Sequence, residues 1–273
     1  MNPPTQNDDG QSSYAIQLVN ASVLPMALKA CIELDVLEII HRAEPHGPLS
    51  SFQIASQIPN CHNPHAASNL LDRMLALLAS YSILTCSVSN GSQKLYSLGP
   101  VSKYFVANAN GVSLAPLFLL NQDKVMMDTW HHMKDAVIEG GLPPFNRAYG
   151  MDASEYVVKK NPSYFQLFKN SMSNYNSMFM EKLMDTYGGF EGLESIVDVG
   201  GGDGSVLNTI VGKYPNIKAI NFDLASVIEN NKSIYPGNYN YFFNQLWQFM
   251  MQIIKYKSQI TVTPEFIPFT ETN

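Results

Sequence analysis

The stretch VDVGGGDGSV, residues 197–206, places four glycines in five positions directly after an apolar, strand-like run. Glycines allow positive φ and let a ligand approach the backbone without an intervening Cβ, and the free N–H groups of a following helix favour polar or anionic groups. A strand over 196–199, a helix over 205–213 and a strand over 219–224 predict a β-α-β unit of a doubly wound sheet. Asp223, at the end of the second strand, is placed to accept hydrogen bonds from ribose hydroxyls. The pattern predicts a site for an adenosine-bearing cofactor; the alternative is a loop that only makes a tight turn.

The glycine loop lacks the signatures of two other nucleotide sites. A nicotinamide dinucleotide site has G-x-G-x-x-G or a final alanine, whereas this loop has serine or leucine at the sixth position, depending on the frame. A P-loop would end in G-K-S or G-K-T, which this loop does not. What remains is an acidic residue, Asp198, followed by G-x-G-x-G at Gly200, Gly202 and Gly204.

The N-terminal part of the chain predicts helices followed by a hairpin. Apolar residues recur at helical spacing over 18–40, and further helices are expected over 51–58 and 65–83. Two strand-like runs then meet at Asn90-Gly91, the strongest short hairpin signal. Helices followed by a hairpin are typical of a winged helix.

A winged helix can bind DNA, but this one has unsuitable side chains for that role. The helix over 66–81 offers Arg73 as its one Lys or Arg and is filled with leucine and alanine, where a DNA-reading helix presents Arg, Lys, Asn or Gln. The formal net charge of -6 also argues against a polyanionic partner. We therefore expect this domain to serve packing and dimerisation, with no nucleic acid as a partner.

Two further helical regions precede the glycine loop, over 117–137 and over 156–187, and the second is rich in Tyr, Phe and Met. Such a stripe is usually core, but flat rings and flexible thioethers also suit a pocket for a flat organic molecule. His131 and His132 lie near two aspartates, yet adjacent histidines point about 100° apart on a helix and cannot easily bind one ion together. We expect them to be ordinary surface or pocket residues and expect no metal.

The composition fits one large or two modest globular domains. With 273 residues, 45% of them hydrophobic and 15% charged, the chain can bury a sizeable core. Its three cysteines are widely spaced and indicate neither a disulfide framework nor a zinc site. The polar start has no signal pattern, and the longest apolar stretch falls far below the roughly 20 residues that a membrane span requires. These features predict a cytoplasmic protein without a membrane partner.

Three segments resemble the plant O-methyltransferases of the caffeic acid type, which depend on S-adenosylmethionine. They are NQDKVMMDTWHHMKDAVIEGGLPPFNRAYGM, GFEGLESIVDVGGG and VDVGGGDGSVLNTIVGKYPNIKAINFDL, and the likeness runs from about residue 14 to 237. The resemblance implies a mixed fold, with an all-α, winged-helix-like dimerisation domain followed by a truncated α/β Rossmann-like methyltransferase domain. The implied parts are a polar leader at 1–13, the dimerisation domain at 14–115, a helical acceptor-lining region at 116–190, the N-terminal part of the cofactor domain at 191–237 and a divergent tail at 238–273.

The resemblance also implies site residues. It places Gly200 at the methionine end of S-adenosylmethionine and Asp223 on its ribose, with Gly202 and Gly204 in the same loop. A small phenolic or phenylpropanoid acceptor would be lined by Leu120, Asn121, Met127, Ala153, Phe168 and Met172. Caffeate-type members carry histidines where this chain has Val157 and Tyr175, so caffeate itself is not implied as the acceptor.

A base matters for methyl transfer to a phenol. With a pKa of about 10, a phenol is only about one part in a thousand ionised at pH 7, and a positioned base contributes about 10²–10⁴-fold. In the family this base is a histidine in an H-D-W segment downstream of the glycine loop. None of the six histidines of this chain follows His132. No catalytic residue is therefore assigned, and the chain is expected to be inactive.

The last part of the chain, 238–273, contains no Gly, Ala, Asp, Arg, His or Cys and is dominated by residues with A/T-rich codons. One hypothesis is that it derives from a retained intron or an altered reading frame; the alternative is an amphipathic helix over 244–257 that caps a truncated sheet. With only two strands expected, the first strand should keep an open apolar edge, and the C-terminal half should be weak and prone to aggregate.

Two functions remain open from the sequence. The first is S-adenosylmethionine-dependent O-methyl transfer to a small phenolic acceptor, at the level of the family. The second is a non-catalytic partner that forms a homodimer or, with full-length O-methyltransferase subunits, a heterodimer through the N-terminal domain.

Overall fold

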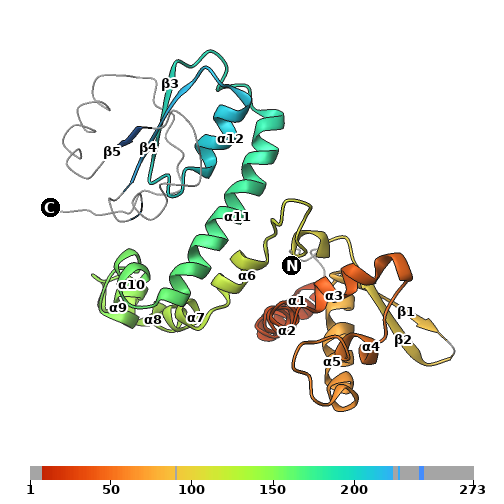
Figure 1. Ribbon diagram of the computed structural model, residues 1–273. Coiled ribbons are helices and arrows are strands. Elements are labelled where there is room, and N and C mark those ends of the chain that lie inside the picture. The colour runs from red at the N-terminus through yellow and green to blue at the C-terminus, as the bar shows by residue number, and fades with distance from the viewer. Residues whose placement is uncertain (1–7, 90, 224–226, 228–239, 243–273) are drawn as a thin grey trace. The chain divides into compact units, whose positions relative to one another are not determined.

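The structure is a computed structural model that describes residues 8–89, 91–223, 227 and 240–242 (Figure 1). The chain divides into two compact units, Met1–Tyr175 and Asn176–Asn273. The long helix α11 (Pro162–Thr186) runs across the boundary between them in the sequence.

The first unit begins with the helices α1 (Asp8–Val19), α2 (Val23–Glu33) and α3 (Val36–Ala43). The single helical pattern expected over 18–40 is therefore interrupted, and its continuity was predicted wrongly. Between α2 and α3 the chain turns at Asp35, which adopts a left-handed conformation with φ 55°. One such residue redirects the backbone without changing the apolar composition, so the periodicity could not reveal it.

The next elements are η1 (Glu44–His46), α4 (Ser51–Ala55) and α5 (Pro64–Ser80). A capping box starts α4, because the Gln53 N–H donates to Ser50 Oγ at 3.3 Å and the Ser50 N–H donates to Gln53 Oε1 at 2.9 Å. Asn63 caps α5 by accepting a hydrogen bond from the Ala66 N–H at 3.1 Å. Both helices appear where the sequence predicts them, although α4 is shorter.

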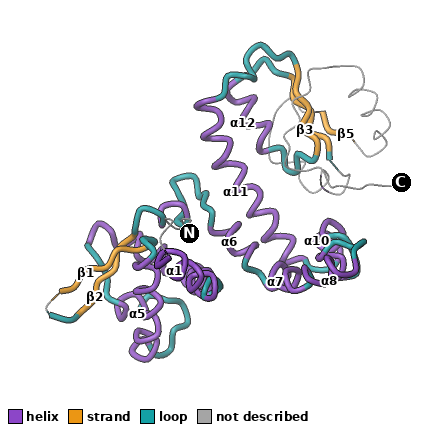
Figure 2. The backbone as a smooth tube through the Cα atoms, turned by 180° about the vertical axis from the view of Figure 1, so that it is seen from behind, coloured by secondary structure: helices purple, strands orange, loops and turns teal. Residues whose placement is uncertain are grey.

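A two-stranded hairpin follows α5. The strands β1 (Leu84–Ser89) and β2 (Gln93–Leu98) lie side by side as a hairpin (Figure 2). They pair antiparallel, with Leu84 opposite Leu98. This confirms the predicted hairpin; the comparison with a winged helix stays a prediction. Helices and hairpin share one core, whose most buried large side chains are Leu37, Ile39, Ile40, Ile54, Leu75, Leu78, Leu84 and Tyr96.

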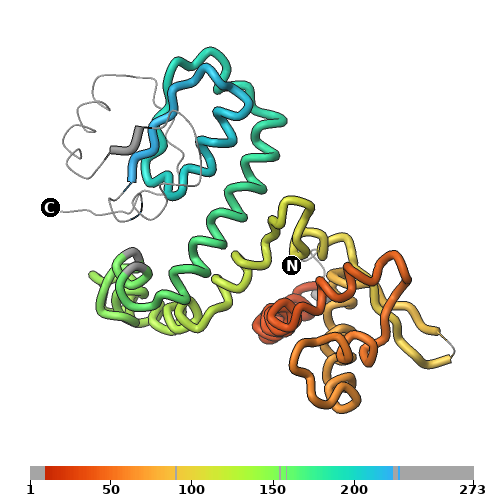
Figure 3. Tube along the Cα trace, in the orientation of Figure 1, coloured from red at the N-terminus to blue at the C-terminus, as the bar shows by residue number. Residues whose placement is uncertain are grey.

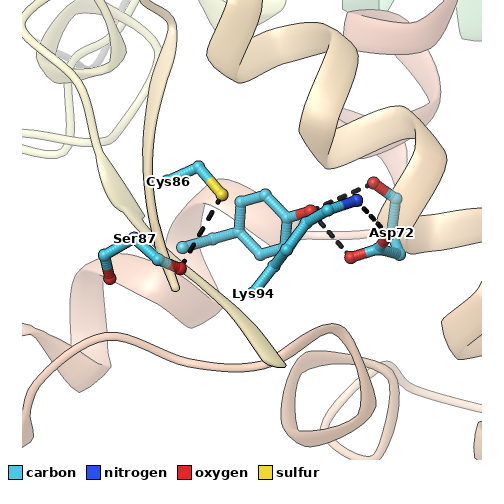
Figure 4. Close-up of polar contacts among 5 residues, drawn as sticks. Asp72, Cys86, Ser87 and Lys94 are labelled. Carbon is cyan, nitrogen blue, oxygen red and sulfur yellow. Dashed lines mark hydrogen bonds and ion pairs between the residues drawn. The ribbon is translucent and has the colours of Figure 1, made fainter. Parts of the chain in front are cut away.

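Tyr96 anchors the hairpin to α5. Its ring is 0% exposed, and its hydroxyl donates to Asp72 Oδ1 at 2.7 Å. Lys94 Nζ pairs with Asp72 Oδ2 at 2.8 Å. Dashed lines in Figure 4 mark the contacts of Asp72. Burial opposes ionisation of Asp72, but the hydrogen bonds from Lys94 and Tyr96 outweigh it and lower the pKa of the carboxyl from its ordinary value of 3.8.

We expect Tyr96→Phe to lower the free energy of unfolding by about 1 kcal/mol, because it removes a partly buried hydrogen bond and little else. Lys94→Met removes an ion pair that is partly exposed to solvent, so it should lower the free energy of unfolding much less than Tyr96→Phe does. Because the folded-state pKa of Asp72 is lowered, its contribution is present above pH 3.8 and is lost as the pH falls through the lowered pKa. Urea titrations at neutral and acid pH measure these differences, and equal effects of the two substitutions would contradict this account.

The rest of the first unit is helical, and Figure 3 follows it along the chain. The helix expected over 117–137 is three helices, so that its continuity was also predicted wrongly. Asp123 starts a new helix by accepting a hydrogen bond from the Val125 N–H at 2.8 Å, and His132 stands between the next two. The elements are η2 (Ser102–Tyr104), α6 (Ala115–Asn121), α7 (Lys124–His131), α8 (Met133–Glu139), α9 (Pro144–Tyr149) and α10 (Ala153–Lys159).

The second unit contains the glycine loop. The strands β3 (Ser195–Val199) and β4 (Lys218–Phe222) pair in parallel and are connected by α12 (Ser205–Lys213) (Figure 1). The predicted β-α-β unit is thereby confirmed. A third strand, β5 (Asn240–Phe242), lies parallel to β4, so that the described strands are ordered β3-β4-β5. The prediction of only two strands is therefore wrong, because a three-residue strand is too short for its alternation to be read from sequence.

The two faces of this sheet differ. On one face Ile196 packs with Met180 and Met184 of α11, Ile210 of α12 and Ile217. On the other face Val197 is 42% and Val199 is 52% exposed. Among the described strands β3 has a neighbour on one side only, as the sequence predicts. The proposed amphipathic helix over 244–257 lies outside the described residues.

Among the described helices no single one is long and apolar enough to cross a membrane. The pair Gly10–Val19 and Val23–Glu33, bent by 50°, meets the requirements of length and composition when both helices are taken together. Core helices of soluble proteins and signal sequences meet the same requirements.

The thiols of Cys31, Cys61 and Cys86 are free, and burial raises the pKa of the Cys31 thiol to about 12.

Candidate functional site

The glycine loop joins the carboxyl end of β3 to the start of α12. Three of its glycines adopt positive φ, with 79° at Gly200, 56° at Gly202 and 79° at Gly204. Residues with a Cβ rarely adopt such conformations, so the loop depends on glycine at these positions. The Gly200 N–H also donates to the carbonyl of Phe222 at 2.7 Å, which ties the start of the loop to β4.

The loop is open on one side and closely packed on the other. A Cβ built on Gly200 or Gly202 would meet no atom within 4 Å, which leaves space for a ligand against the backbone. A Cβ on Gly201 would instead lie 2.3 Å from Asn221 Oδ1 and 2.8 Å from Asp198 Oδ2. The middle of the loop therefore rests directly on the two strand ends.

Asp223 lies at the carboxyl end of β4 and contacts the loop. Its Oδ2 accepts a hydrogen bond from the Gly202 N–H at 2.8 Å. Two residues earlier, Asn221 Nδ2 donates to the Gly202 carbonyl at 3.1 Å. The predicted residues Gly200, Gly202, Gly204 and Asp223 are thus brought together by the structure in one small region of the second unit.

Asp198 adds a second carboxylate to this region. It stands opposite Asn221 in the register of β3 and β4. Burial, and then repulsion from Asp223, raise the pKa of the Asp198 carboxyl above its ordinary value of 3.8. Two carboxylates near an open backbone favour a ligand that offers hydrogen-bond donors or positive charge.

The start of α12 completes the loop. Gly204 precedes the helix, and the Ser205 N–H is satisfied by Asp203 Oδ1 at 3.0 Å. Sequence reasoning missed Asn221 as a residue of this region. The signal that could have found it is its position two residues before Asp223, which puts both side chains on the same face of β4.

The six residues expected to line an acceptor all lie in the first unit, and the structure separates them into two groups. Leu120, Phe168 and Met172 belong to or pack against one apolar cluster, which also includes Tyr149, Tyr156 and Tyr164. Met127 is half-buried on α7, whereas Asn121 and Ala153 are exposed at helix ends. Val157, for which the resemblance implies a histidine in caffeate-type members, is buried in the same cluster.

Of the two histidines considered for a metal, His131 is the last residue of α7, and His132 lies between α7 and α8. His132 Nδ1 is 3.8 Å from Asp135 Oδ2. Within the described residues, no three or more His, Cys, Asp or Glu side chains are grouped so that they could hold a metal ion.

Comparison with known proteins adds to this geometry. The family pattern of the O-methyltransferase dimerisation domain matches residues 16–108, and that of the O-methyltransferase domain matches residues 130–243. Caffeic acid 3-O-methyltransferase from Medicago sativa is 53% identical over 239 residues, which cover 86% of this chain. The chain belongs to the O-methyltransferase family of the caffeic acid type.

Two other relatives of the chain are O-methyltransferases as well. Caffeic acid 3-O-methyltransferase from Prunus dulcis is 54% identical over 87% of the chain, and esculetin O-methyltransferase from Kitagawia praeruptora is 49% identical over 86% of it. The chain spans slightly less than two thirds of these relatives, 64% of the Medicago sativa protein and 65% of the other two.

Solved structures show the same fold at low sequence identity. Human N-acetylserotonin methyltransferase in complex with SAM superposes with a TM-score of 0.70 at 19% identity, covering 89% of this chain and 68% of that structure. CalO1, a methyltransferase of calicheamicin biosynthesis in an SAH-bound form, also gives a TM-score of 0.70, at 17% identity, covering 89% of this chain and 68% of that one. The fold is thus a helical dimerisation domain followed by an α/β methyltransferase domain, as predicted, and the two solved structures hold SAM and SAH respectively.

Proposed function

We propose that the glycine-loop site serves, at the level of the family, the transfer of a methyl group from S-adenosylmethionine to the hydroxyl of a small phenolic acceptor of the phenylpropanoid type. The observation that carries the proposal is the arrangement of Gly200, Gly202, Gly204 and Asp223 around an open backbone. The relatives named for caffeic acid and esculetin, both phenols, support the acceptor class.

The loop residues fit this cofactor. The missing Cβ atoms at Gly200 and Gly202 leave room for the ligand to approach the backbone, and Asp223 presents an oxygen that can accept from ribose hydroxyls. S-adenosylmethionine would supply the methyl group on a cationic sulfonium, and the carboxylates of Asp198 and Asp223 would favour that charge. The role proposed for the loop glycines, Asp198 and Asp223 is thus to bind and orient the cofactor.

We expect Asp223→Asn to weaken binding of S-adenosylhomocysteine by about tenfold, because the amide keeps the shape of the side chain but loses the charge that strengthens its hydrogen bonds. Glu194→Gln is the matched control, since it removes the same charge from an exposed side chain just before β3 and should leave the affinity unchanged. Titration calorimetry measures both. Equal affinity of wild type and Asp223→Asn would show that Asp223 does not contact the ribose.

For the acceptor we propose the apolar cluster of the first unit. Its aromatic side chains offer flat surfaces: the Phe145 and Tyr149 rings lie 4.9 Å apart between centroids, and those of Tyr149 and Tyr156 lie 4.5 Å apart. The six residues Leu120, Asn121, Met127, Ala153, Phe168 and Met172 are retained as the proposed lining. With Val157 in place of a histidine, an acceptor less polar than caffeate is favoured.

The base that a phenol needs is a separate question. Because no histidine follows His132, we propose that the polypeptide of these 273 residues does not by itself transfer the methyl group at an appreciable rate. A transfer assay with radiolabelled S-adenosylmethionine and a panel of phenols tests this. Turnover above that of the Asp223→Asn variant would show that another group accepts the proton.

The second candidate function is a dimerisation partner. Ile16 and Val19 of α1 and Val23 and Met26 of α2 are exposed large apolar side chains, as expected of a surface that a second subunit covers. We propose pairing with another copy or with a full-length O-methyltransferase subunit. Sedimentation of wild type and an Ile16→Asp/Val19→Asp variant tests pairing between copies, and co-purification with a full-length relative tests the heterodimer.

A further inference from the structure

We propose that Asn221 is the positioning residue of the glycine loop: it holds the loop in the conformation that binds the cofactor and is retained for that role rather than for stability. The inference rests on the proposed cofactor site but concerns a residue outside the loop and the ribose contact. Asn221 lies on β4, within the second unit.

The contacts of Asn221 reach three glycines of the loop. Its Nδ2 donates to the Gly202 carbonyl at 3.1 Å and lies 3.4 Å from the place where a Cβ on Gly204 would stand. Its Oδ1 lies 2.3 Å from the corresponding place on Gly201. The amide therefore fills the underside of the loop and leaves no space for a side chain at Gly201.

Gly202 is held at both of its backbone polar groups. Asp223 accepts from its N–H at 2.8 Å, and Asn221 donates to its carbonyl. A ligand that takes up oxygens of Asp223 competes with the first of these bonds but leaves the second in place. Asn221 can thus keep the loop in position while Asp223 turns to the ligand.

The burial of Asn221 speaks against a purely stabilising role. The side chain is 1% exposed, and Oδ1 has no hydrogen-bond partner. A buried polar atom without a partner lowers stability, whereas an apolar side chain of similar shape at the same place would avoid that loss. The presence of an asparagine at this position is therefore explained better by its contacts with the glycine loop than by a contribution to the stability of the core.

The test is Asn221→Leu in the 273-residue chain, with Asn216→Leu, at an exposed position before β4, as the matched control. We expect Asn221→Leu to weaken binding of S-adenosylhomocysteine about tenfold or more in titration calorimetry, with a melting temperature equal to or above that of wild type. Asn221→Asp, which keeps the shape but lacks the Nδ2 donor, should also lose affinity. The control should change neither quantity.

Two results would overturn the inference: a marked fall in the melting temperature of Asn221→Leu, which would make Asn221 an ordinary core residue, or an unchanged affinity. If wild type itself does not bind S-adenosylhomocysteine, the proposed function fails. Hydrogen exchange of the loop amides then tests whether Asn221 positions the loop. Amides of residues 200–204 should exchange faster in Asn221→Leu than in wild type and in Asn216→Leu. Equal exchange in all three would also overturn the inference.

Discussion

Gly201→Ala is expected to lower the affinity for S-adenosylhomocysteine by about a hundredfold or more and to reduce the free energy of unfolding by about 1–3 kcal/mol. The added Cβ would lie 2.3 Å from Asn221 Oδ1 and 2.8 Å from two atoms of the Asp198 carboxyl group. Asn221 is buried and hydrogen-bonded to Gly202, so it cannot simply move aside. The loop itself must shift, and with it the backbone that a cofactor would contact.

Gly212→Ala is the matched control for this substitution. Gly212 lies in α12, and a Cβ there would meet no atom within 4 Å. Alanine is favoured over glycine inside a helix by about 0.8–1.0 kcal/mol, so this variant should be equally or more stable and should bind as wild type does. Titration calorimetry measures the affinity of both variants, and urea unfolding measures their free energy of unfolding. Wild-type affinity in Gly201→Ala would mean that the loop does not contact the cofactor.

Leu120→Ala should reduce the free energy of unfolding by about 2–5 kcal/mol. Leu120 is 5% exposed and forms a buried cluster with Val125, Val157 and Tyr164. Removing most of its side chain leaves a cavity that the packed rings around it can fill only in part.

The adjacent residue supplies the comparison for Leu120. Asn121, proposed for the same acceptor lining, is exposed at the end of α6, so that Asn121→Ala should change stability by less than about 0.5 kcal/mol. Unfolding curves followed by the circular dichroism signal of the helices measure the free energy of unfolding of the Leu120→Ala and Asn121→Ala variants. A small effect of Leu120→Ala would indicate that the side chain faces a space able to admit a ligand rather than a filled core.

Hydrophobic spacing and turn chemistry were enough to predict several elements of this protein. The Asn90-Gly91 pair predicted the hairpin of β1 and β2, because few residues other than Asn and Gly adopt positive φ readily. The apolar run before the glycines and the helical pattern after them predicted β3 and α12, the latter with the observed bounds of 205–213. These signals are local, so the amino-acid sequence carries them without knowledge of the fold.

Helix continuity could not be read in the same way. The breaks at Asp35 and at Asp123 depend on single residues that redirect the chain or cap a new helix, while the apolar periodicity continues past them. The strand β5 was missed because its three residues join the sheet through backbone pairing with β4. Backbone pairing between distant segments leaves no mark on so short a stretch of sequence.

The same division holds for the candidate site. The sequence by itself determined the β-α-β unit, the positions of Gly200, Gly202, Gly204 and Asp223 and the family to which they point, because spacing along one short segment specifies all of them. Only the tertiary structure decided which side of the loop is open, that Asn221 and Asp198 lie beneath Gly201, and that Leu120 is buried while Asn121 is exposed. Those properties depend on which atoms from separate strands and helices come into contact. The contacts form only when the chain folds, because folding sets the register of β3 against β4 and the packing of α6 against its neighbours.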